Sequence, residues 1–226
     1  GKYSTATIQR CFSAIRKAHL LLGFPSPLGS PQVMAVWRGL RRLQGTAPKR
    51  AKRPLLLEHV KRMIASIQLS PTCIRDTAII LLGFAGAFRR SELCGLDLED
   101  LTFEERGVKI RLRRSKTDQT GEGRVIGIPP GASPATCPVQ ALQAWLRVRG
   151  DAPGPLFPST RSATGVLTPQ MVRLIVRRAC QAAGIDPSDY SAHSLRSGFV
   201  TQAIRGGASD HSVMDQTGHR DASMIR

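Results

Sequence analysis

The chain has 226 residues, of which 41% are hydrophobic, and its 33 Lys and Arg against 16 Asp and Glu give a formal net charge of +17. The hydrophobic content is sufficient for a packed core and excludes a disordered chain, while the length suits one large domain or two small ones. So large a positive charge predicts a polyanionic partner, with nucleic acid first and an acidic membrane surface second.

Apolar runs and cysteines narrow the class further. No apolar run reaches the roughly 18 residues of a membrane span, and no secretory signal with its small-residue cleavage site is visible. The five cysteines are odd in number, widely spaced and free of CxxC pairs, so they predict neither a disulfide framework nor a zinc site. We therefore expect a soluble intracellular protein in a reducing compartment.

Positive charge is concentrated in residues 1–53, which hold eleven Lys and Arg and no acidic residue. From Glu58 onward, both signs are mixed in ordinary proportion. A stretch of this length without one acid favours a surface that meets a polyanion over an ordinary solvated face. The candidates for contact with nucleic acid are Arg10, Arg16, Lys17, Arg41, Arg42, Lys49, Arg50, Lys52 and Arg53.

Two helices are expected within this basic stretch. Apolar residues recur at helical spacing from Ile8 to Leu22, and Ser30 and Pro31 open a second helix whose apolar face includes Trp37. Residues 44–54, QGTAPKRAKRP, are typical of a flexible basic linker.

The remaining residues mix helices with a few strands. Periodicity and turn residues predict helices near residues 60–67, 73–84, 89–96, 138–149, 169–183 and 192–205. Alternation of Val108, Ile110 and Leu112 with basic residues, and the run GRVIGIP after the loop DQTGEG, predict a hairpin or small antiparallel sheet over residues 107–129. The expected fold class is mainly α with a small antiparallel β-sheet (α+β).

Four segments carry candidate chemistry: GAFRRSEL with Arg89, RRSKTD with Lys116, HSLRSG with His193 and Arg196, and TGHRDASMIR with His219. In this order they resemble the tyrosine recombinase (phage integrase) family, whose catalytic set is Arg, Lys, His-x-x-Arg, His or Trp, and a nucleophilic Tyr. The resemblance covers nearly the whole chain. HxxR alone is a weak motif, whereas the four segments together are a strong combination.

The residue types suit phosphodiester chemistry. Forked guanidinium groups bind phosphate oxygens that gain negative charge during attack, a role that fits Arg89 and Arg196. His193 lies one helical turn before Arg196 and so shares its face, where it can accept the proton of the attacking hydroxyl. Lys116 on the hairpin can protonate the leaving 5′ oxygen, and His219 can donate to a non-bridging oxygen. No cofactor or metal is expected, because the cluster is cationic.

Each assignment has a plainer alternative. Arg89 can form an ion pair with Glu92 at i, i+3, and Arg90 can be the phosphate ligand instead. Lys116 can be a solvated loop lysine. His193 and His219 can be helix or loop residues without chemistry.

The resemblance also implies domains. Residues 1–43 correspond to the C-terminal part of a helical core-binding domain, residues 44–54 to the linker and residues 55–226 to the catalytic domain without its C-terminal tail. The two tyrosines, Tyr3 and Tyr190, do not match the nucleophile, which by the family's spacing falls just beyond Arg226. The expectation is therefore a fragment that binds DNA but does not cleave it.

The implied activity is site-specific DNA recombination or integration, as in mobile elements, through a 3′-phosphotyrosine intermediate, in the cytoplasm at the nucleoid. The implied partner is double-stranded DNA with a specific recombination site, bound by a homotetramer when full length and by a mainly monomeric fragment, with no membrane. The alternatives are a type IB topoisomerase, a non-catalytic DNA-binding regulator of the same fold, and an RNA-binding or membrane-surface protein.

Overall fold

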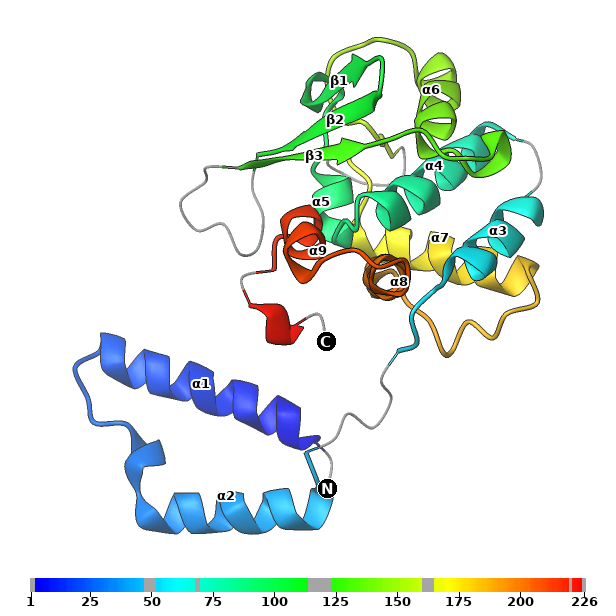
Figure 1. The fold of residues 1–226 in the computed structure, drawn as a ribbon. Coiled ribbons are helices and arrows are strands. Elements are labelled where there is room, and N and C mark those ends of the chain that lie inside the picture. The colour runs from blue at the N-terminus through cyan, green and yellow to red at the C-terminus, as the bar shows by residue number, and fades with distance from the viewer. Residues whose placement is uncertain are drawn as a thin grey trace. The chain divides into compact units, whose positions relative to one another are not determined.

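The fold is mainly helical with one three-stranded antiparallel sheet (Figure 1). The computed structural model describes residues 3–46, 52–67, 70–113, 123–159, 165–219 and 221–224. The chain divides into two compact units, residues 1–51 and residues 52–226. The fold class predicted from the sequence is confirmed.

The smaller unit is a pair of helices, α1 (Thr5–Leu21) and α2 (Pro31–Gln44), joined by the 3₁₀ turn Pro27–Gly29. The Phe12 ring packs on the Trp37 ring at 5.1 Å between centroids. Trp37 is buried, but no residue of α1 is, and Ile15 is 40% exposed. The predicted apolar stripe is therefore only partly covered, because a single neighbouring helix offers too little surface to bury it.

The larger unit contains the remaining elements. They are α3 (Leu57–Ala65), α4 (Pro71–Ala85), α5 (Arg90–Cys94), β1 (Leu101–Glu104), β2 (Gly107–Leu112), β3 (Arg124–Ile128), α6 (Pro138–Arg149), α7 (Pro169–Ala182), α8 (His193–Arg205) and α9 (Asp210–Thr217), with 3₁₀ turns at Leu98–Asp100, Pro134–Thr136 and Ala222–Met224. α6 has the predicted bounds, and α7 and α8 each differ by one residue at one end. β1 and α9 were not predicted.

The sheet has the order β1-β2-β3, with Ile110 paired to Leu101 on one side and to Ile126 on the other. Val108, Ile110 and Leu112 are buried while Lys109 and Arg111 are exposed, as their alternation predicts. The sequence did not predict β1, because a short edge strand with mostly exposed side chains shows no apolar alternation.

α4 is the central helix of the core, with every residue from Ala78 to Gly83 buried. It packs against α6, α7 and α8 (Figure 1). A Cβ at Gly83 would lie 3.1 Å from the side chain of Leu195, so this glycine lets α8 approach closely. On α8 itself, a Cβ at Gly198 would overlap the backbone of Leu55. These contacts fix α8, which carries two of the candidate residues.

Candidate functional site

Arg196 is the centre of the site. It lies on the buried side of α8 with 1% of its surface exposed. Its Nη1 donates to the carbonyl oxygen of Ala87 and its Nη2 to that of Thr217, both at 2.6 Å. Burial, and then the like charge of Arg89, lower its pKa to about 10, so the side chain remains cationic at neutral pH. The protein thus holds a charged guanidinium out of water with backbone carbonyls as its partners.

His219 completes this arrangement at the end of α9. Its Nε2 lies 3.1 Å from Arg196 Nη2, and its Nδ1 lies 2.9 Å from the hydroxyl of Thr217. That hydroxyl donates to the carbonyl of Val213 and therefore accepts from His219. The ring consequently carries its proton on Nδ1 and accepts from Arg196 at Nε2. Burial, followed by Arg196, lowers the pKa of His219 to about 4, so the ring is neutral at pH 7.

Two turns place these partners beside Arg196. Ala87 has φ 48°, the one non-glycine residue with positive φ in the described parts of the chain, and it presents its carbonyl to Arg196. Gly218 ends α9 in the left-handed region at φ 67°, which glycine adopts at little cost, and turns the chain toward His219.

Arg89 lies at the start of α5 and is paired with Glu92. The carboxylate of Glu92 accepts from the Arg89 backbone nitrogen at 2.7 Å and from its Nη1 at 2.6 Å. The ion pair considered from the sequence is therefore present. It does not remove Arg89 from the site, because Arg89 lies near enough to lower the pKa of both Arg196 and His219.

His193 is the first residue of α8, one turn before Arg196. Part of the His193 side chain is exposed, but burial of the rest of the ring lowers its pKa. The positive charges of Arg196, Arg89 and Arg90 lower this pKa further. A neutral imidazole beside several arginines can accept a proton.

Arg124 is a residue of this region that the sequence did not single out. It begins β3, and its Nη2 lies 3.9 Å from Glu92 Oε2. Its position within an amphipathic strand pattern predicts only an ordinary surface arginine, so no sequence signal marked it. With Arg89, Arg124 and Arg196 around the single carboxylate of Glu92, the site carries an excess of positive charge.

The remaining predicted residues fall into three groups. Lys116, Lys49 and Arg50 fall outside the described residues. Lys52 donates to the carbonyl of Ser188, and Arg53 lies 3.5 Å from Asp189, so both are attached to the larger unit. The predicted contacts Arg10, Arg16, Lys17, Arg41 and Arg42 of the smaller unit are exposed, and so is Arg38, which was not among them.

Metal-binding clusters and membrane-spanning helices are both absent from the described ranges. No three His, Cys, Asp or Glu side chains there lie together so as to hold a metal ion. No helix in those ranges is both long and apolar enough to cross a bilayer. Tyr190 is buried, and its ring lies 5.7 Å from that of His59.

Relatives support one family. The chain is 38% identical over 228 residues to an integrase/recombinase XerD homolog of Selenomonas ruminantium, covering 97% of this chain and 66% of the relative. It is 33% identical over 149 residues to the tyrosine recombinase XerC of Corynebacterium glutamicum, covering 65% of this chain and 43% of the relative. The chain therefore spans about two thirds or less of the length of these relatives.

Solved structures share the fold. The Tn1549 transposon integrase matches with a TM-score of 0.71 at 20% identity, covering 99% of this chain and 74% of its own. The XerH site-specific recombinase matches with a TM-score of 0.64 at 18% identity, covering 100% of this chain and 66% of its own. A model of the phage integrase family matches residues 54–226. Together with the site around Arg196, that match over most of the sequence shows that the chain belongs to the phage integrase family.

Proposed function

We propose that this chain is the DNA-binding and phosphate-holding part of a tyrosine-type site-specific recombinase. The structures of the Tn1549 integrase and of XerH that it resembles are complexes with transposon end DNA and with the difH substrate. Double-stranded DNA with a specific recombination site is accordingly the proposed partner here.

The observation that carries this proposal is the buried, charged guanidinium of Arg196. Isolated positive charge inside a protein is costly, and the nearby carboxylate of Glu92 is already paired with Arg89 at 2.6 Å and with Arg124 at 3.9 Å. A phosphodiester supplies the missing negative charge, most of all in the transition state, when the charge on its oxygens grows.

The residues divide the chemistry among themselves. Arg89 and Arg196 bind the non-bridging oxygens. His193 takes the proton of an attacking hydroxyl as the new P–O bond forms, and Lys116 gives a proton to the 5′ oxygen as its bond to phosphorus breaks. His219 accepts from Arg196 in the free chain, so it donates to the phosphate only after it gains a proton at Nε2.

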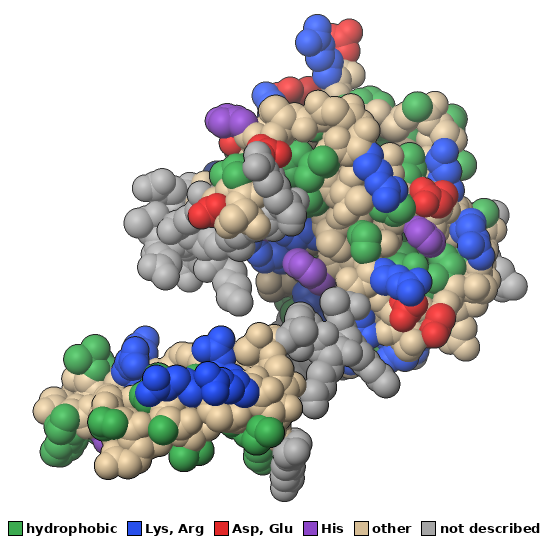
Figure 2. All heavy atoms as spheres, turned by 60° about the horizontal axis from the view of Figure 1, so that its bottom comes forward, with side chains coloured by type: hydrophobic (Ala, Val, Ile, Leu, Met, Phe, Trp, Pro, Cys, Tyr) green, Lys and Arg blue, Asp and Glu red, His purple; other side chains and the backbone are tan. Residues whose placement is uncertain are grey.

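The smaller unit is proposed to hold the DNA backbone. Figure 2 shows its Lys and Arg side chains gathered on the visible face, with hydrophobic side chains toward its edges. The guanidinium of Arg41 also lies 5.9 Å from the centroid of the Trp37 ring, which helps to fix its direction. The proposed contacts of this unit are Arg10, Arg16, Lys17, Arg41, Arg42, Lys49 and Arg50, with Lys52 and Arg53 continuing into the larger unit.

Neither tyrosine of the 226 residues is proposed as the nucleophile. Tyr190 is buried against His59, and the resemblance assigns that position to packing. A nicked suicide substrate incubated with this chain should give no covalent adduct. An adduct mapped to Tyr190 by mass spectrometry would contradict this assignment.

The resemblance also predicts a mainly monomeric free chain, which sedimentation can test.

The central experiment asks whether one DNA phosphate is coupled to Arg196. Binding sites are first selected from random duplexes with this chain. Each phosphate of the selected site is then replaced in turn by an uncharged methylphosphonate, and the affinity of the wild type is compared with that of Arg196→Gln. Arg205→Gln, an exposed arginine on the same helix, is the control.

We expect one phosphate of the selected site whose neutralisation weakens binding by the wild type and by Arg205→Gln, but not by Arg196→Gln. The reason is that an interaction already lost cannot be lost again. If neutralisation of every phosphate affects Arg196→Gln as strongly as the wild type, Arg196 does not hold a phosphate and the proposal is wrong.

A further inference from the structure

Arg124 connects the sheet to the end of α9. Its Nη1 donates to the carbonyl oxygens of Asp215 at 3.1 Å and Gln216 at 2.9 Å. The next carbonyl, that of Thr217, accepts from Arg196. A helix leaves its last carbonyls without partners inside the helix, so two arginines from distant segments satisfy three consecutive ones here. The C-terminus of α9 is thus held by Arg124 and Arg196 together.

The guanidinium of Arg124 also lies against the turn that leads to His219. A Cβ at Gly218 would lie 3.0 Å from Arg124 Cζ and 3.1 Å from its Nη1, closer than ordinary packing allows. The φ of 67° favours glycine at this position, and a side chain there would also press on this guanidinium.

A second contact of Arg124 reaches the other half of the site. Its Nη2 lies 3.9 Å from Oε2 of Glu92, the same oxygen that accepts from the backbone nitrogen of Arg89. Only 20% of the Arg124 side chain is exposed, and its Nε and Nη2 are buried without a hydrogen-bond acceptor among the described residues. The side chain is therefore held by Nη1, by Gly218 and by the charge of Glu92.

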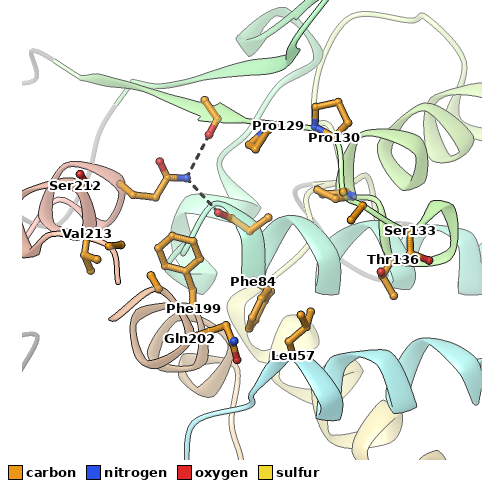
Figure 3. Close-up of a pocket in the computed structure, with 18 of the residues that line it drawn as sticks. Leu57, Phe84, Pro129, Pro130, Ser133, Thr136, Phe199, Gln202, Ser212 and Val213 are labelled. Atoms are coloured by element: carbon orange, nitrogen blue, oxygen red, sulfur yellow. Dashed lines mark hydrogen bonds between the residues drawn. The ribbon is translucent and has the colours of Figure 1, made fainter. Parts of the chain in front are cut away.

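A neighbouring amide anchors the same helix. The side-chain nitrogen of Gln216 donates to the carbonyls of Ala85 at 3.1 Å and Gly127 at 3.3 Å, beside the pocket of about 580 Å³ between Phe84, Phe199 and Pro129 (Figure 3). These bonds attach the C-terminal turn of α9 to α4 and β3. Beyond Gln216, Arg124 and Arg196 contact residues 217–219 from other elements of the fold.

We propose that Arg124 is a positioning residue for the phosphate site: it holds the last turn of α9 and Gly218 so that His219 stays against Arg196. The inference depends on the proposed function in one respect only, namely that His219 meets the phosphate. The geometry itself concerns the free chain and can be tested without DNA.

The test uses Arg124→Lys and Arg124→Gln. Lysine keeps the charge but lacks the fork that reaches two carbonyls and Glu92, whereas glutamine removes the charge. The matched controls are Arg62→Lys and Arg62→Gln, because Arg62 Nη2 donates at 2.8 Å to the carbonyl of Ala183, at the end of α7. Two quantities are measured by NMR in each variant: the pKa of His219 and the hydrogen-exchange rate of the Gly218 amide, which donates to Met214.

In both Arg124 variants, we expect the pKa of His219 to rise by about one unit or more, because the ring gains water and moves away from Arg196. The other groups that lower this pKa, Arg196, Arg89 and His193, are unchanged in these variants. The Gly218 amide should exchange about tenfold faster, with amides in α4 unaffected. Both Arg62 variants should match the wild type.

Other outcomes overturn the inference. A raised pKa in Arg124→Gln alone, with wild-type exchange in both variants, would mean that Arg124 acts only through its charge. Unchanged exchange in both variants would mean that it holds nothing. If one variant does not fold, the exchange rate of the other decides. Arg124→Lys keeps the charge, and loss of a nearby positive charge in Arg124→Gln by itself slows base-catalysed exchange, so faster exchange in either variant reports release of the turn. Loss of the coupling between DNA phosphates and Arg196 would instead count against the proposed function alone.

Discussion

At the scale of single residues, the site depends on arginines whose partners are backbone atoms. Arg196 is bound by the carbonyls of Ala87 and Thr217, and Arg124 by those of Asp215 and Gln216. Carbonyl oxygens orient a guanidinium without neutralising it. The positive charge is therefore already positioned in the free chain, as the proposed phosphate site requires.

The lowered pKa of His219 predicts a pH dependence of stability. Between its ordinary pKa of 6.5 and its folded value of about 4, the unfolded chain binds a proton that the folded chain does not. The free energy of unfolding should therefore fall as pH is lowered through that window. Denaturant unfolding at several pH values measures it. His219→Gln should flatten the dependence, although the smaller contribution of His193 remains.

The control for this prediction is His211→Gln, because His211 lies on the exposed side of α9, with 87% of its side chain accessible. That variant should retain the wild-type dependence. If His219→Gln also retains it, the ring is not held in its neutral form by the fold.

At the scale of elements, close approach of backbones fixes the helix that carries the site. Gly198 faces the backbone of Leu55, whose nitrogen donates to the carbonyl of Ser194. Gly198→Ala places a methyl group where that backbone lies, and should lower the free energy of unfolding by about 3 kcal/mol. Gly39→Ala on α2, where a Cβ meets nothing within 4 Å, should raise it by about 0.5 to 1 kcal/mol. Circular dichroism during denaturation distinguishes the two; equal effects would contradict the close contact.

The turn before Arg89 contains a residue in an unfavourable backbone conformation. Ala87 occupies the left-handed region at φ 48°, which costs a residue with a Cβ about 1 to 2 kcal/mol. Ala87→Gly relieves this cost and loses burial of one methyl group, about 0.8 kcal/mol. We expect a net gain in the free energy of unfolding of up to about 1 kcal/mol. Ala85→Gly, in the last turn of α4, should instead lose about 0.5 to 1 kcal/mol.

At the scale of the whole molecule, the net charge of +17 is the basis of the proposed interaction with DNA. If about six to ten phosphates are neutralised, the logarithm of the affinity should fall with the logarithm of the salt concentration, with a slope near −0.9 per contact. Fluorescence anisotropy with a random duplex at several salt concentrations measures this slope. A flat response would exclude an extended backbone contact.

Matched variants identify the residues that contribute to the slope of this salt dependence. Arg41→Gln combined with Arg42→Gln should reduce its magnitude by about 1 to 2, because both side chains are exposed on α2 and each is proposed to meet a phosphate. Arg53→Gln should change it less, since Arg53 already has Asp189 as a partner. An equal effect of both changes would mean that the slope reports total charge rather than these contacts.

How much of this could be predicted is clearest for particular elements. The alternation in β2 and the apolar run of α4 predicted those elements correctly. Burial on one face leaves a period in the sequence, and burial all round leaves a continuous apolar run. α9, DHSVMDQT, has only two buried residues, Val213 and Thr217, and so shows no apolar period. It was not predicted, although it ends two residues before His219.

The sequence by itself determined the residue types of the site, the helices that carry them and the large positive charge, since local periodicity and composition are properties of neighbouring residues. Only the tertiary structure decided that Arg196 lies between the carbonyls of residues 87 and 217, that Glu92 serves two arginines, and that Arg124 holds the end of α9. The physical reason is that these partners are largely backbone oxygens from segments far apart in the chain. Every residue has such an oxygen, so no residue type marks the ones that folding brings to an arginine.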